Sequence, residues 1–212
     1  RGDHPEIDTS EELDEKGIKQ YQSLIGALQW TISLGRLDIT TAVMSLSSFR
    51  ASPRKGHMER VKHIYGYLSK MRHATIRIRT GDPDFSDIKE HDYDWEYSVY
   101  GNVKEVIPDD IPTPLGKQVT LVTYVDANLY HDLITGRSVT GILHLVNGTP
   151  FDWYSKKQNT VETSTYGSEF VAARIAVDQI IDHRMTLRYL GVPINQKTYM
   201  FGDNKTVVDS SI

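Results

Sequence analysis

Cysteine is absent from the 212 residues of this chain. Its absence excludes a disulfide framework and any metal site with thiolate ligands, and it favours an intracellular protein. The apolar runs are far shorter than the roughly 20 residues that cross a bilayer, and the first residues do not resemble a signal peptide, so no membrane association is expected. Positive charge is not in excess either, because the formal net charge is -4. Any nucleic-acid binding must therefore rely on a local basic patch.

The composition is that of an ordinary globular protein, with 39% hydrophobic and 25% charged residues. The length suits one large domain or two small ones. Neither end of the sequence has the features of a natural terminus, which predicts a fragment of a longer protein. Residues 3–15 are acidic and polar and are expected to form a solvating tail or linker.

Three stretches between residues 18 and 70 show apolar residues at helical spacing, which predicts a compact helical subdomain over residues 1–80. Gly35 is expected to end the first helix, Asp38 to cap the second, and Pro53 to break it. The alternation in residues 74–80 predicts a short half-buried strand. The apolar positions are Tyr21, Leu24, Ile25, Leu28 and Ile32, then Ile39, Ala42, Val43, Leu46 and Phe49, then Met58, Val61, Ile64 or Tyr65, and Leu68.

The same region is rich in basic residues, and two interpretations are open. They could form a surface that follows a phosphate backbone, or they could be the solvated face that amphipathic helices need. Charge pattern alone favours the solvated face. These residues are Arg50, Arg54, Lys55, Arg60, Lys62, Lys70, Arg72, Arg77 and Arg79.

Residues 81–118 contain repeated proline and glycine and an acidic, aromatic patch over residues 82–100. This composition predicts a linker between two units.

Residues 119–212 predict three antiparallel strands, a long helix, a fourth strand and a further helix. The strands are expected at 119–126, 138–146, 151–155 and 198–202, with a tight Asn147-Gly148 hairpin turn. The long helix should begin at residues 163–165 and end before Gly191. Its expected buried stripe is Tyr166, Phe170, Ala173, Val177 and Ile180. The crossover through this helix would set the fourth strand parallel to a strand of the meander, giving an α/β or α+β mixed sheet.

Three carboxylates lie at element ends that this topology brings together. Asp126 closes the first strand, Glu169 begins the long helix and Asp203 closes the fourth strand. Each alone is explained by capping or by the helix dipole. Together they would repel one another unless cations held them, and oxygen ligands without cysteine favour Mg²⁺ or Mn²⁺. Two such ions would suit phosphodiester hydrolysis.

The C-terminal half resembles the RNase H domain of copia-type LTR-retrotransposon Pol polyproteins, and the helical third resembles the segment that joins polymerase to RNase H in them. The matching blocks are Tyr124-Val125-Asp126-Ala127-Asn128, Arg137-Ser138-Val139-Thr140-Gly141, Trp153-Tyr154-Ser155-Lys156-Lys157-Gln158, Thr165-Tyr166-Gly167-Ser168-Glu169-Phe170, Gly202-Asp203-Asn204, Tyr21-Gln22-Ser23-Leu24-Ile25-Gly26-Ala27-Leu28 and Arg36-Leu37-Asp38-Ile39.

The resemblance implies an RNase H-like fold and hydrolysis of the RNA strand of RNA–DNA hybrids with two Mg²⁺ or Mn²⁺ ions. It implies Asp126, Glu169 and Asp203 as the metal-binding, catalytic acids. The expected partners are the hybrid and the polymerase domain of the same polyprotein, in the cytoplasm (within a virus-like particle) or the nucleus. The implied nucleic-acid contacts are Arg137, Ser138, Thr140, Lys156, Lys157, Gln158 and Asn204.

The chain also departs from the family pattern. Gly167 replaces one helix glutamate and Asn128 one aspartate, both expected to be peripheral. The fourth metal-site residue and the last strand and helix of the family are expected beyond Ile212, and the polymerase palm is absent. Two other functions therefore stay open: a nucleic-acid-binding module with little or no turnover, and a structural scaffold in which the acids are caps.

Overall fold

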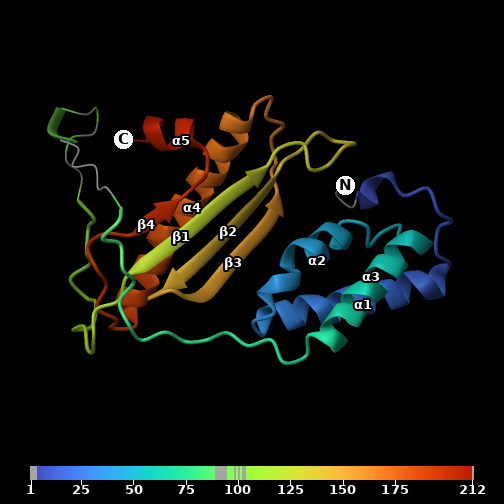
Figure 1. Ribbon diagram of the computed structural model, residues 1–212, viewed down its shortest axis with the longest axis horizontal. Coiled ribbons are helices and arrows are strands. Elements are labelled where there is room, and N and C mark those ends of the chain that lie inside the picture. The colour runs from blue at the N-terminus through green and yellow to red at the C-terminus, as the bar shows by residue number, and fades with distance from the viewer. Residues whose placement is uncertain (1–3, 89–94, 98, 100, 102–103, 212) are drawn as a thin grey trace.

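The computed structural model describes residues 4–88, 95–97, 99, 101 and 104–211 (Figure 1). Its elements follow in the order η1 Pro5–Ile7, α1 Glu15–Ser33, η2 Leu37–Ile39, α2 Thr40–Ser47, α3 Lys55–Lys70, η3 Trp95–Tyr97, β1 Leu121–Asn128, β2 Val139–Val146, β3 Thr149–Lys157, α4 Thr165–Tyr189, β4 Tyr199–Phe201 and α5 Lys205–Ser210.

The four strands form one mixed sheet in the order β3-β2-β1-β4. β1, β2 and β3 are antiparallel neighbours, and β4 lies parallel to β1, as the sequence predicts. The hairpin between β2 and β3 turns at Asn147 and Gly148, whose φ angles of 49° and 76° place both in the left-handed region. Asparagine and glycine tolerate that conformation best, which explains why the chain reverses here.

Helix α4 covers one face of the sheet, and its buried surface differs from the predicted stripe (Figure 1). Of the expected residues only Ala173 is buried, whereas Phe170 and Val177 are 48% and 42% exposed. The face turned to the sheet carries Ala172 and Ala176 instead. Small side chains let the helix approach the strands closely, so the larger apolar residues are left outside.

Helices α1, α2 and α3 form a bundle around Tyr21, Ile25, Leu28 and Val43, all fully buried. Trp153 of β3 packs against this bundle, whereas its neighbour Tyr154 packs against the cluster under α4. Adjacent strand residues point to opposite faces, so the bundle and α4 lie on opposite sides of the sheet. The three helices that the sequence predicts in this region are thus present.

Two local predictions in the N-terminal third are wrong. Residues 74–80 form no strand, and Ile78 is 79% exposed. The backbone N–H of Arg79 donates to the side-chain hydroxyl of Thr149 at 2.6 Å, so this contact with β3 is not a strand pairing. Asp38 does not cap α2, since the carboxylate pairs with Arg36 at 2.8 Å and accepts a hydrogen bond from Tyr67.

The acidic N-terminal segment is not a solvating tail. Asp8 pairs with Arg60 of α3 at 2.6 Å. Hydrogen bonds from Ser10, and then the Arg60 guanidinium, lower the pKa of Asp8 to about 2. Glu11 and Glu12 pair in the same way with Lys55 and Arg54. Several of the basic residues predicted on this helical face are thus neutralised within the protein.

Residues 89–94, 98, 100, 102 and 103 of the predicted linker lie outside the described residues, and most of the remainder up to residue 118 is irregular. Glu105 in this stretch binds Arg184 of α4 at 2.8 Å and Arg188 at 2.5 Å. The division of the chain at residues 80 and 118 stays a prediction. Among the described helices, none combines the length and apolarity that a bilayer crossing requires.

Candidate acidic metal site

The carboxylates of Asp126, Glu169 and Asp203 meet at one end of the sheet. Each offers an oxygen, and these three atoms lie within 4.8 Å of one another. The three residues come from β1, from the N-terminal end of α4 and from the loop after β4. This is the arrangement that the order of elements predicts.

The register of the parallel strands explains why the two aspartates are neighbours. The last paired positions of β1 and β4 are Tyr124 and Phe201. Asp126 and Asp203 each follow by two residues, so their side chains leave the sheet on the same face and at the same level. Glu169 reaches the pair from α4, and the backbone N–H of Ala127 donates a hydrogen bond to its carboxylate.

The electrostatics of the three acids are unequal. Asp126 and Asp203 are exposed, whereas only 8% of Glu169 is accessible to solvent. Burial, and to a smaller extent the negative charges of Asp126 and Asp203, raise the pKa of Glu169 to about 7, against the lowering effect of the hydrogen bond from Ala127. A buried carboxylate beside two others is stabilised in its charged form by a cation, and the oxygen-only donor set fits Mg²⁺ or Mn²⁺.

A cleft of about 570 Å³ opens beside the aspartates, between the sheet and the helical bundle. Tyr124 and Phe201 stack in its wall with ring centroids 5.3 Å apart, and Thr40 lines the opposite side. Clefts of this size hold small ligands or part of a larger one. The site therefore combines an acidic end with an aromatic wall.

Three of the residues expected to contact nucleic acid are buried inside the protein. Ser138 and Thr140 have no exposed surface, and Gln158 has 3%. The Gln158 amide donates to the hydroxyl of Thr140 at 3.0 Å and to the carbonyl of Ser168 at 2.8 Å. Gln158 thus joins β2 to the start of α4, and these three side chains do not face a ligand at the surface.

The other expected contacts differ in their availability. Arg137 and Lys156 are exposed. Lys157 forms an ion pair with Asp132, whose carboxylate also accepts hydrogen bonds from two backbone N–H groups of its own loop. Asn204 caps α5, because its side chain accepts hydrogen bonds from the second and third backbone N–H groups of that helix. Arg137 and Lys156 are therefore the positions best placed for a phosphate.

A second group of possible metal ligands was not predicted from the sequence. His144, Asp152 and His183 each offer an atom within 4.8 Å of the others. No short motif joins them, since they lie on β2, β3 and α4, and only the sheet register could have revealed their proximity.

Comparison with known proteins relates the chain to transposon polyproteins. It is 29% identical over 204 residues to the retrovirus-related Pol polyprotein from transposon TNT 1-94 of Nicotiana tabacum, a match that covers 96% of this chain and 12% of the polyprotein. It is 27% identical over 168 residues to a transposon Ty5-1 protein of Saccharomyces cerevisiae, covering 78% of this chain and 42% of that protein.

A third relative is not named as a transposon protein. Secreted RxLR effector protein 161 of Plasmopara viticola is 27% identical over 161 residues, which cover 76% of this chain and 89% of the effector. No family model matches the chain, and no solved structure matches it. The similarities to Pol polyproteins support a region of a retrotransposon polyprotein, and the chain spans only about an eighth of the tobacco protein.

Proposed function

We propose that this chain is an RNase H-type endonuclease module of a retrotransposon Pol polyprotein. The observation that carries the proposal is the convergence of Asp126, Glu169 and Asp203 from three separate elements. The mixed four-stranded sheet is compatible with an RNase H-like fold. The similarity to Pol polyproteins supplies the context in which such an activity occurs.

The chain's own residues suit a site for divalent cations. Asp126 and Asp203 would provide exposed oxygens at the edge of the cleft, and Glu169 would provide a buried one. Bound Mg²⁺ or Mn²⁺ would lower the pKa of a water molecule and offset charge on the leaving oxygen of a phosphodiester. The hydrogen bond from the backbone N–H of Ala127 favours the charged form of Glu169, which is the form that binds a cation.

The proposed substrate is the RNA strand of an RNA–DNA hybrid. The chain has a formal net charge of -4, so attraction to a polyanion depends on local groups such as Lys156 and Arg137. The stacked pair of Tyr124 and Phe201 offers an apolar surface beside the acids. Discrimination of RNA from DNA would use the 2′-hydroxyls, which polar groups around the cleft can contact.

The test is cleavage of an end-labelled RNA–DNA hybrid by the 212-residue chain in the presence of Mg²⁺. We expect cleavage of the RNA strand only, with loss on addition of chelator. Asp126→Asn and Asp203→Asn should each lower the rate roughly 100-fold or more, because each removes a negative charge and one of two carboxylate oxygens without changing side-chain size. Asp178→Asn, an exposed aspartate on α4, is the matched control and should retain full activity.

Two outcomes would reject the proposal. Cleavage unaffected by Asp126→Asn would show that the activity arises elsewhere or from a contaminating nuclease. Salt-dependent binding of the hybrid without cleavage, measured by fluorescence anisotropy, would identify a binding module instead.

A binding or effector role is the second candidate, favoured by the relative from Plasmopara viticola. That protein matches this chain over 89% of its own length and is named as a secreted effector. A sequence similar to this chain can therefore make up most of a protein that is not named as a transposon polyprotein. The presence of all three acids favours the enzyme hypothesis over a binding or effector role. The cleavage assay decides between these two functions.

A further inference from the structure

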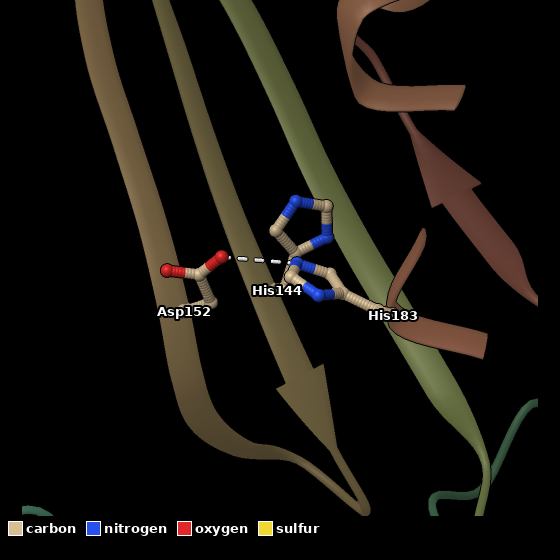
Figure 2. A group of neighbouring side chains, drawn as sticks. All are labelled: His144, Asp152 and His183. Atoms are coloured by element: carbon tan, nitrogen blue, oxygen red, sulfur yellow. Dashed lines mark ion pairs between the residues drawn. The ribbon is translucent and has the colours of Figure 1, made fainter. Parts of the chain in front are cut away.

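A second cluster of metal-ligating side chains lies on the face of the sheet that α4 covers. Figure 2 shows His144 on β2, Asp152 on β3 and His183 on α4 pointing toward one another. The rings of His144 and His183 meet edge to face with centroids 4.6 Å apart. Nε2 of His183 lies 3.0 Å from a carboxylate oxygen of Asp152. Each of the three residues offers a ligand atom within 4.8 Å of the others.

The contacts of His183 leave its ring nitrogen without a hydrogen bond. Nε2 is buried and has no hydrogen-bond partner among the described residues, although the Asp152 oxygen is close. Nε2 of His183 and the Asp152 oxygen are close but do not form a hydrogen bond, so this nitrogen remains unsatisfied. A buried polar atom without a partner is costly, and a bound cation would use its lone pair.

His144 is oriented by groups on both of its ring nitrogens. Nδ1 lies 2.9 Å from the hydroxyl of Thr123, and Nε2 lies 3.0 Å from the side-chain oxygen of Gln179. A metal bound at either nitrogen would displace one of these two partners, and the other partner would remain to orient the ring, as in most metal-ligating histidines. Burial also lowers the pKa of His144, which favours the neutral ring that metals require.

The cluster is separate from the acidic site. His183 follows Glu169 by fourteen residues on α4, which is about 21 Å along the helix axis at about 1.5 Å per residue. Its ligands are also chemically different, since two nitrogens and one oxygen suit a borderline transition metal better than Mg²⁺. We propose that His144, Asp152 and His183 form a Zn²⁺ site that ties the C-terminal half of α4 to the β2–β3 hairpin.

The spacing of the three residues is close to what such a site needs. Ligands about 2.0–2.2 Å from a tetrahedral Zn²⁺ ion lie about 3.4 Å from one another. The His183–Asp152 pair is already at 3.0 Å, and adjustment of side chains brings atoms within 4.8 Å to this distance. Three protein ligands leave a fourth position for water, and Asp152, whose side chain is 48% exposed, leads from the site to solvent.

A metal at this place would strengthen the half of α4 that has fewer buried residues. The buried residues of α4 lie mainly in its first half, and in the second half Arg184 alone is buried among the described residues. Polar contacts hold this half to its neighbours, through Gln179, His183 and Arg184. A ligand that binds only the folded state would raise the melting temperature.

The experiment is titration of the metal-free 212-residue chain with Zn²⁺ in excess Mg²⁺, which would compete for the acidic site under the proposed function. We expect one tightly bound Zn²⁺ by isothermal calorimetry and a rise in melting temperature. Co²⁺ should give the visible absorption bands of a tetrahedral site. His183→Gln and Asp152→Asn should each weaken Zn²⁺ binding more than about 100-fold, since even loss of a supporting residue costs 10–100-fold.

The controls separate this site from the acidic one and from adventitious binding. His73→Gln removes an exposed histidine and should leave Zn²⁺ affinity unchanged, as should Asp126→Asn. Circular dichroism with chelator checks that each variant folds. The proposal fails if the unmodified chain binds no Zn²⁺ under these conditions. It also fails if folded His183→Gln and Asp152→Asn bind Zn²⁺ as the unmodified chain does.

Discussion

Replacement of Glu169 by glutamine should stabilise the metal-free protein at neutral and alkaline pH. The carboxyl is 8% exposed and its pKa is raised from 4.5 to about 7, chiefly by burial. A shift of one pKa unit corresponds to about 1.36 kcal/mol, so ionising this group costs about 3 kcal/mol more in the folded state than in the unfolded chain. Glutamine has the same shape without the charge, and its oxygen can still accept the hydrogen bond from Ala127.

The sign of the pH dependence follows from the direction of the shift. Between pH 4.5 and about 7 the folded protein holds a proton on Glu169 that the unfolded chain has lost. The free energy of unfolding therefore decreases as the pH rises through this interval, by about 3 kcal/mol in total, and is constant above it. Glu169→Gln should match the unmodified protein below pH 4.5 and exceed its stability by about 3 kcal/mol at pH 8.

Urea denaturation followed by circular dichroism measures both proteins across this pH range with chelator present. The comparison between variants cancels the titration of other groups, such as Asp8, whose pKa is lowered. Asp178→Asn removes an exposed carboxylate from the same helix and should show no such pH-dependent gain. Addition of Mg²⁺ should stabilise the unmodified protein more than Glu169→Gln, because only the former keeps all three acids.

A constant difference between the two proteins at every pH would refute this reasoning, since the gain must follow the ionisation of Glu169. A second check separates burial from repulsion. Burial is the larger cause of the raised pKa and the charge of Asp126 a smaller one. Asp126→Asn should consequently recover only a minor part of the 3 kcal/mol, and full recovery would show that repulsion dominates.

Three further changes test other parts of the fold. Glu105→Gln removes the charged partner of the buried Arg184 and should lower the free energy of unfolding by about 1–2 kcal/mol at pH 7, measured by urea denaturation. This loss should shrink as the pH falls from 4.5 to about 2, because Glu105 becomes protonated in the unmodified protein over that interval. Gln158→Leu leaves Thr140 and a backbone carbonyl without their donor and should cost about 1–3 kcal/mol. Lys156→Ala should leave stability within about 0.5 kcal/mol but weaken hybrid binding and reduce its salt dependence by about one ion; unchanged binding would remove Lys156 from the interface.

Sequence pattern predicted the sheet order because its signals are local and mutually consistent. The Asn147-Gly148 turn specifies an antiparallel hairpin, and a helix of 25 residues between β3 and β4 requires a crossover. These constraints predict a β4 parallel to a strand of the meander, and the structure adds that this strand is β1. The meeting of Asp126 and Asp203 was thus predictable on the condition that β4 pairs with β1, without any knowledge of side-chain packing.

The orientation of α4 was not predictable in the same way. Its large apolar residues suggested a stripe through Phe170 and Val177, yet the structure buries Ala172 and Ala176. A helix that must lie close to a sheet presents small residues there, and helical periodicity does not distinguish a close face of alanines from an apolar face turned outward. The acidic N-terminal segment was misread for a related reason, since its partners on α3 lie some 50 residues away.

The histidine cluster depends on a one-residue bulge in β3, which shifts the pairing of β3 with β2. From a two-residue turn, regular pairing would set Phe151 opposite His144, but the bulge after Leu145↔Pro150 sets Asp152 there instead. A shift of one residue turns a side chain to the other face of a sheet, so without the bulge Asp152 would point away from α4. Pro150 has no N–H to donate to the ladder, and proline in a strand commonly accompanies a bulge. Pro150 is thus a signal for a bulge in the sequence, but only the register shows that the bulge brings a carboxylate to two histidines.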